Sequence, residues 1–126
     1  MLKRVTNGFT LVELMVVMAI IALLLSLALP RYFNHLETSR ETILKQDLAV
    51  MRDAIDKYHG DRGRYPDSID ELVSARYLRA IPVDPITERS DTWQVVAPPG
   101  DDPGAMYDIH SGAPGNARGG SAYADW

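Results

Sequence analysis

The sequence predicts an α+β protein in which one long N-terminal helix packs on a small antiparallel sheet. Three observations predict this class: an uninterrupted apolar run near the N-terminus, a helical stripe of apolar residues after it, and two strand-like segments nearer the C-terminus. With 126 residues, of which 46% are hydrophobic, the chain has room for one modest domain besides the apolar run.

The apolar run extends from Phe9 to Leu29. As a helix it would be about 31 Å long at roughly 1.5 Å per residue, which matches the hydrocarbon core of a bilayer and predicts a transmembrane helix. Lys3 and Arg4 precede the run and the next basic residue is Arg31, so the N-terminus is expected in the cytoplasm and the C-terminal body across the membrane. A secretory signal peptide fits less well, because its apolar core has only about 7 to 15 residues.

Charge is distributed unevenly along the chain. It carries 13 Lys and Arg against 17 Asp and Glu, for a formal net charge of -4, and Lys3 and Arg4 lie before the apolar run. The remainder is acidic, so no nucleic-acid partner is expected. The chain has no cysteine, which excludes disulfides, thiolate metal sites and a cysteine nucleophile.

Glu13 places an ionisable group inside the apolar run. Burying such a group in lipid costs at least about 2.5 to 3.5 kcal/mol on insertion scales, so Glu13 needs a partner. Two interpretations remain open at this point. Glu13 lies shallow enough to reach the headgroups, or its carboxylate pairs with a positive group of a neighbouring chain inside an assembly.

Residues 30–59 are predicted to continue the helix as an amphipathic segment. Apolar residues recur there at steps of four and three and form one helical stripe, made of Leu44, Leu48, Met51, Ile55 and Tyr58. The whole helix, from Phe9 to His59, would be about 76 Å long. Pro30 removes a backbone donor and clashes with the preceding turn, so a kink or local opening is expected there. Gly60 and Gly63 end the helical pattern.

Residues 60–126 are predicted to form a small α+β head. Ser68 or Asp67 can cap a short helix, with Glu71 three residues after Ser68 as in a capping box. We interpret Glu71 as a solvated charge at the start of that helix. The two prolines of the segment Tyr77–Pro85 impose an extended path.

Two segments have the composition of strands. Asp91–Ala97 is rich in β-branched and aromatic residues, and Met106–Ile109 is its expected antiparallel partner across a turn rich in proline and glycine. Trp93 belongs either to the core or to a contact between subunits. Residues 111–126 are rich in Gly, Ala and Ser and are expected to form a loop.

No enzyme site is expected. Asp108, His110 and Ser111 are close in sequence, but alternation along a strand puts Ser111 on the opposite face from the other two, which is not a triad geometry. His35 and His59 have no ligand partners at metal-binding spacing, so both are expected to be exposed on the helix.

The segment KR…GFTLVE at residues 3–13 resembles the prepilin processing motif of the type IV pilin superfamily. The resemblance implies that residues 1–8 are a leader peptide, that prepilin peptidase cuts between Gly8 and Phe9, and that the new amino terminus on Phe9 is N-methylated. It also implies that Glu13 pairs with the N-terminal amine of an adjacent subunit, and that the helix can melt at a proline just beyond the apolar run.

The segment YLRAIPVDP at residues 77–85 resembles a block of the major, G-type pseudopilin of type II secretion systems. This resemblance implies a pilin-like fold and a structural subunit of a periplasmic pseudopilus that pushes secreted proteins outward. The implied partners are further copies of the chain in a helical filament, minor pseudopilins, prepilin peptidase, an inner-membrane assembly platform and, before assembly, the lipid bilayer. The implied location is the bacterial inner membrane, with residues 9–29 spanning it and the head in the periplasm.

In major pseudopilins a calcium ion staples the C-terminal loop, and residues 107–113 resemble the strand that leads into that loop. Calcium takes six to eight oxygen ligands. The chain departs from the family pattern at residues 114–116, where an aspartate is usual and Pro-Gly-Asn stands instead. The candidate ligands are Asp108, Asn116 and Asp125. The alternative is a loop held by Trp126 and Tyr123 packing onto the sheet.

Two other functions remain as alternatives. The first is a type IV pilus pilin, although many pilins close their C-terminal loop with a disulfide that a chain without cysteine cannot form. The second is a single-pass, membrane-anchored periplasmic enzyme or binding protein, which would leave Glu13 without a partner.

Overall fold

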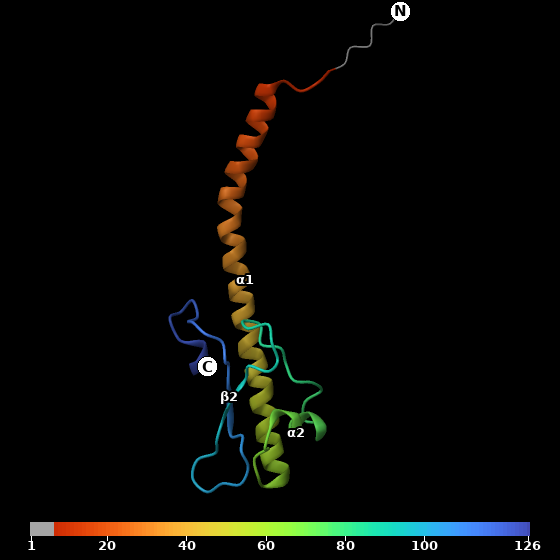
Figure 1. Cartoon of the computed structure of the whole chain (residues 1–126), viewed down its shortest axis with the longest axis vertical. Coiled ribbons are helices and arrows are strands. Elements are labelled where there is room, and N and C mark those ends of the chain that lie inside the picture. The colour runs from red at the N-terminus through yellow and green to blue at the C-terminus, as the bar shows by residue number, and fades with distance from the viewer. Residues whose placement is uncertain (1–6) are drawn as a thin grey trace, which may run out of the picture. The chain divides into compact units, whose positions relative to one another are not determined.

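The structure is a computed structural model that describes residues 7–126. Most of the predicted leader peptide, with Lys3 and Arg4, lies outside the described residues. The chain divides into two compact units, Met1–Glu37 and Thr38–Trp126. Its elements in chain order, shown in Figure 1, are the helices α1 (Leu11–Arg62) and α2 (Ile69–Ser74), the strands β1 (Gln94–Val96) and β2 (Asp108–His110), and the 3-10 helix η1 (Tyr123–Asp125).

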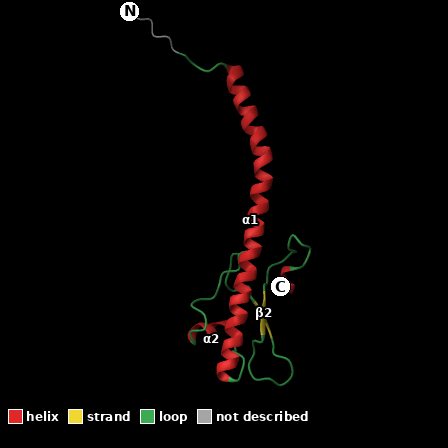
Figure 2. Ribbon diagram, turned by 180° about the vertical axis from the view of Figure 1, so that it is seen from behind, coloured by secondary structure: helices red, strands yellow, loops and turns green. Residues whose placement is uncertain are grey.

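The helix α1 continues without interruption through Pro30 (Figure 2). Of the expected kink or local opening at Pro30, the structure therefore shows no opening, and melting of the helix there during assembly stays a prediction. A proline inside a helix removes one backbone hydrogen bond and costs roughly 3 kcal/mol. The backbone stays α-helical on both sides of it, so the loss is confined to one turn.

The second part of α1 carries the core of the head. The predicted stripe is confirmed, because its five residues are at most 1% exposed; they are Leu44, Leu48, Met51, Ile55 and Tyr58. The side chains that complete this core come from the head and are Leu72, Leu78, Trp93, Met106 and Ile109. Figures 1 and 2 show α2 and the two strands beside this part of α1. Trp93 is a core residue, and its indole N–H donates to the Pro82 carbonyl at 2.8 Å.

The end of α1 lies three residues beyond the predicted one. Gly63 stops the helix with a φ of 70°, a conformation that costs glycine little, and its N–H donates to the His59 carbonyl at 2.9 Å. The prediction that His59 is exposed is wrong. The His59 ring is half-buried and stacks on Tyr65 with 4.1 Å between ring centroids, because the turn after Gly63 brings Tyr65 back to the helix end.

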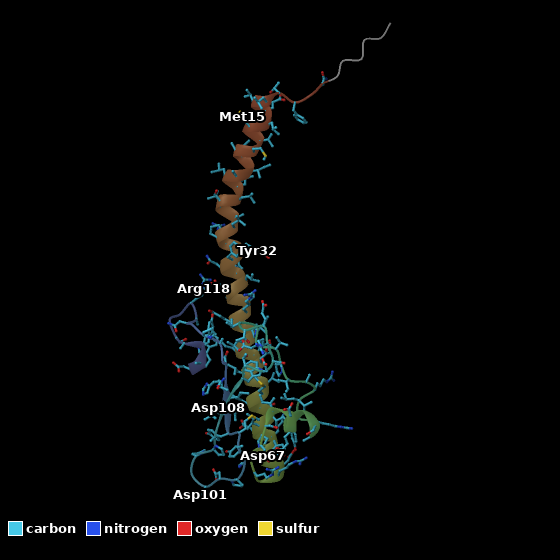
Figure 3. The ribbon with its side chains drawn as sticks, in the orientation of Figure 1. Met15, Tyr32, Asp67, Asp101, Asp108 and Arg118 are labelled. Atoms are coloured by element: carbon cyan, nitrogen blue, oxygen red, sulfur yellow. The ribbon has the colours of Figure 1, made fainter. Side chains whose placement is uncertain are left out.

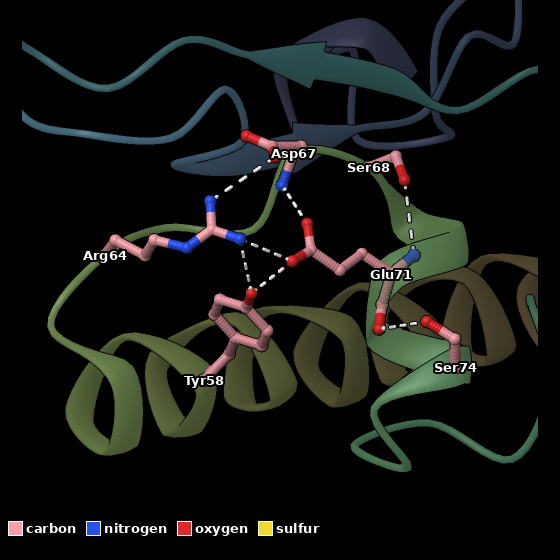
Figure 4. Close-up of polar contacts among 6 residues, drawn as sticks. All are labelled: Tyr58, Arg64, Asp67, Ser68, Glu71 and Ser74. Atoms are coloured by element: carbon pink, nitrogen blue, oxygen red, sulfur yellow. Dashed lines mark hydrogen bonds and ion pairs between the residues drawn. The ribbon is translucent and has the colours of Figure 1, made fainter.

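The helix α2 begins as predicted, with Ser68 as its N-cap accepting from the Glu71 N–H at 3.2 Å. The interpretation of Glu71 as a solvated charge is wrong. Figure 4 shows its carboxylate facing Tyr58 and Arg64. Glu71 accepts hydrogen bonds from the Tyr58 hydroxyl, from Arg64 Nη2 at 2.7 Å and from the Asp67 N–H at 2.7 Å. These bonds tie α2 to the end of α1.

The same contacts change the acidity of the cluster. The hydroxyl of Tyr58, together with the Asp67 N–H and the charge of Arg64, lowers the pKa of the Glu71 carboxyl from its ordinary value. The hydrogen bond to Glu71 in turn raises the pKa of the Tyr58 hydroxyl.

The strands β1 and β2 pair in antiparallel fashion, with Val95 opposite Ile109. The predicted pairing is confirmed, but both strands are shorter than expected. Met106 does not join β2, because its N–H donates to the Pro66 carbonyl at 2.9 Å instead of to β1. The Met106 N–H is thus bonded to the turn at residues 65–66, and β2 does not begin until Asp108.

Candidate functional site

The first candidate site lies in the N-terminal unit and starts where α1 begins. Residues 7–10 are not helical, so Gly8 and Phe9 precede the helix, and the Phe9 side chain is 89% exposed. Every large apolar side chain from Phe9 to Leu29 is between 46 and 89% exposed. Figure 3 shows these side chains around Met15 pointing outward. Within residues 7–126, α1 is the one helix long and apolar enough to cross a membrane.

Glu13 forms a capping box with Thr10 at the start of α1. The Thr10 N–H donates to Glu13 Oε2 at 3.0 Å, and the Glu13 N–H donates to Thr10 Oγ1 at 3.1 Å. Thr10 therefore belongs to the site, although the sequence analysis missed it. The signal was present, because a threonine followed three residues later by a glutamate just before an apolar run is the pattern of a capping box.

The capping box decides what Glu13 does in an isolated subunit. Its carboxylate satisfies one of the free N–H groups at the start of α1, and the negative charge lies at the end of the helix where the dipole favours it. Pro30, the other predicted assembly residue, is exposed about 25 Å farther along the helix. The two residues therefore form no common site within one chain.

The calcium candidates lie in the head. The Asp108 carboxylate already accepts two hydrogen bonds at Oδ1, from Arg52 Nε at 2.7 Å and from the Ile109 N–H at 2.8 Å. Asn116 and Asp125 are both exposed. Within residues 7–126, no three side chains of the types His, Asp and Glu gather as they would around a metal ion. Calcium binding remains a prediction, and this donor set does not fit calcium well.

A buried pair in the head was missed by the sequence analysis. Asp84 is fully buried, and its carboxylate accepts from the Ser111 hydroxyl at 2.5 Å and from the Ile86 N–H at 2.8 Å. Burial, and then the nearby charge of Asp84, raises the pKa of the Asp47 carboxyl on α1. Ser111 faces away from Asp108 and His110, as the strand alternation predicted, so these three residues do not form a triad.

Comparison with known proteins agrees with this geometry. A family model described as the prokaryotic N-terminal methylation motif matches residues 3–29. Type II secretion system core protein G of Pseudomonas aeruginosa is 30% identical over 141 aligned positions, which cover 99% of this chain and 96% of that protein. The chain belongs to the type II secretion system core protein G family. It is a pseudopilin of the type IV pilin-like superfamily, as the two sequence motifs predicted.

Other relatives of this pseudopilin include both secretion pseudopilins and fimbrial proteins. Type II secretion system core protein G of Escherichia coli is 30% identical over 132 positions, covering 90% of the pseudopilin and 85% of that protein. Type IV major fimbrial protein FimA of Dichelobacter nodosus is 40% identical over 55 positions, but these cover only 44% of the pseudopilin and 35% of FimA. The type IV pilin alternative is therefore less favoured. No solved structure gave a significant match.

Proposed function

We propose that this pseudopilin is a non-catalytic structural subunit of a periplasmic type II secretion pseudopilus, which pushes secreted proteins outward. One observation carries the proposal. The part of α1 from Leu11 to Leu29 is apolar on all sides, exposed on all sides, and interrupted by a single carboxylate, that of Glu13. A helix of this kind can be covered by lipid before assembly and by neighbouring subunits afterwards.

Processing by prepilin peptidase between Gly8 and Phe9 fits the local backbone. The peptide bond lies in the non-helical segment before α1, where a protease can bind an extended chain. Nothing lies within 4 Å of the position that a Cβ of Gly8 would take, so the backbone there is open to close approach. The new amino terminus on Phe9 is then N-methylated.

Assembly gives Glu13 a cation. In the isolated subunit its Oε2 accepts from the Thr10 N–H, which leaves its negative charge uncompensated. The N-terminal amine of an adjacent subunit would supply the opposite charge. Away from water such a pair is strong, because the alternative is an unpaired carboxylate among apolar side chains.

The subunits then leave the membrane laterally and add to the base of a helical filament whose core is residues 9–29. The helix melts near Pro30 during this step. The machinery also contains minor pseudopilins and an inner-membrane assembly platform. Its energy comes from a separate cytoplasmic ATPase, because this sequence contains no nucleotide-binding loop. The N-terminus lies in the cytoplasm before processing, and the head lies in the periplasm.

Variants of Glu13 test this mechanism. Glu13→Ala and Glu13→Gln should insert into the membrane at the wild-type level but form no filaments, or form them much more slowly, in an assay of sheared or purified filaments. The matched control is Glu37→Ala, which removes an exposed carboxylate of α1 beyond the apolar run and should assemble normally. If both Glu13 variants form filaments at the wild-type rate, the proposed pairing is wrong.

A further inference from the structure

The C-terminal loop of the head, residues 111–126, is fixed in place although it contains little regular structure. Its elements are η1 and an isolated bridge between Asn116 and Ala122. Ala113 and Ala117 are nevertheless only 3% and 8% exposed. A small head without a disulfide needs some other staple to hold such a loop.

Arg52 of α1 supplies contacts of the kind that a bound cation would make. Its Nε donates to Asp108 Oδ1 at 2.7 Å, and its Nη2 donates to the main-chain oxygens of Ile109 at 2.9 Å and of Trp126 at 2.6 Å. His110 Nδ1 lies 2.5 Å from the same oxygen of Trp126. The guanidinium of Arg52 thus binds oxygens of the strand β2 and an oxygen at the end of the loop.

Two further residues on the same side of α1 hold the loop. Glu41 Oε1 accepts from the Arg118 N–H at 2.9 Å and from the Tyr123 hydroxyl at 3.1 Å. Lys45 Nζ lies 4.6 Å from the centroid of the Trp126 ring. Spacings of four and seven residues put Glu41, Lys45 and Arg52 on one helical face. The loop is therefore attached at its middle and at its end.

We propose that Arg52 is the cation that staples the C-terminal loop, in place of calcium. Guanidinium is a planar, permanently charged donor that can bind several oxygens at once. The side chains of Arg52 and Asp108 are 36% and 29% exposed, so their charge-assisted hydrogen bonds are partly protected from water. A calcium ion at Asp108 would be repelled by the guanidinium that already neutralises this carboxylate.

The test uses the full-length chain in detergent, so it needs no filament and can fail or succeed separately from the proposed function. Equilibrium dialysis with radioactive calcium, and thermal unfolding in millimolar calcium or in EDTA, measure whether the metal matters. We expect no bound calcium and the same Tm in both buffers. Stoichiometric binding, or a Tm raised by calcium, would overturn the proposal.

Hydrogen exchange then identifies the cation. Arg52→Gln should raise the exchange rate of the amides in residues 111–126 roughly tenfold, because hydrogen bonds to a charged group are lost. Arg52→Lys keeps the positive charge but loses the planar guanidinium that binds several oxygens at once, and should give an intermediate exchange rate. The control Lys57→Gln removes a cation of α1 that pairs with the exposed Asp53, and should change nothing in the loop.

Wild-type exchange rates in both Arg52 variants would contradict the proposal. If Arg52→Gln does not fold, Arg52→Lys still decides the question. If only the length of the side chain mattered, the amides of residues 111–126 would exchange in Arg52→Lys at the wild-type rate.

Discussion

The two parts of α1 differ in what covers them. From Leu11 to Glu37 every side chain is exposed, whereas from Thr38 to Arg62 one stripe is buried completely. A helix that is apolar on all sides must be covered by molecules outside the chain, while a helix with one apolar stripe is satisfied by its own head. We therefore expect the contacts of assembly in the first part and the stability of the fold in the second.

The largest expected contrast is between two leucines. Leu48→Ala empties a site in the core that is 1% exposed and should lower the free energy of unfolding of the head by about 2 to 5 kcal/mol. Leu24→Ala, at a side chain that is 60% exposed, should leave it unchanged. Denaturant unfolding of the full chain in detergent, followed by the fluorescence of Trp93 and Trp126, measures both. Equal losses would contradict the division of roles within α1.

The next effect comes from the buried pair in the head. Ser111→Ala removes the hydroxyl that donates to Asp84 Oδ2 and accepts from the Ala113 N–H, so both of these buried atoms lose a hydrogen-bond partner. The expected loss of stability is about 1 to 3 kcal/mol. The control is Ser90→Ala at an exposed serine. If the two variants unfold at the same denaturant concentration, the buried pair contributes no stability.

A smaller effect compares the two helix caps. Ser68→Ala removes the N-cap of α2 and should destabilise the head by about 1 kcal/mol. Thr10→Ala removes the same kind of cap from the start of α1 and should not change the stability of the head, because Thr10 lies in the other unit. Thermal unfolding of both variants checks this difference. A loss of stability in Thr10→Ala as large as that in Ser68→Ala would show that the two units unfold together.

The smallest effect is a pH dependence. The folded state lowers the pKa of Glu71 below its ordinary value of 4.5, so its contribution to stability is fully present above that pH. The contribution is lost as the pH falls below 4.5 through the lowered pKa. Glu71→Gln should therefore flatten the stability curve on its acid side, below pH 4.5. The exposed Glu37→Gln, in the other unit, should leave the curve as in the wild type.

Patterns local in sequence predicted most of the fold. The steps of four and three from Leu44 to Tyr58 predicted the buried stripe, and the composition of the two strands predicted their pairing. The cap at Ser68 was also predictable, because its partner Glu71 is three residues away. Such features depend only on helical and strand periodicity and on neighbouring residues.

Contacts between distant residues were not predictable. Arg52 and Asp108 are 56 positions apart, Asp84 and Ser111 are 27 apart, and the hydrogen bond from Tyr58 to Glu71 spans 13. Whether a charge is solvated or paired depends on which segments the fold brings together, and periodicity does not contain that information. Glu71 was therefore interpreted as solvated, and the loop ligands were assigned to calcium without Arg52.

Intact mass tests the central claim most directly, that this chain is a processed subunit of a filament. The chain is expressed with and without an active prepilin peptidase, and the membrane-extracted protein is weighed by mass spectrometry. The account predicts that the peptidase removes residues 1–8 and that the product, beginning at Phe9, carries one added methyl group. A chain that stays uncut beside an active peptidase would contradict the account and leave the segment before α1 as an ordinary signal anchor.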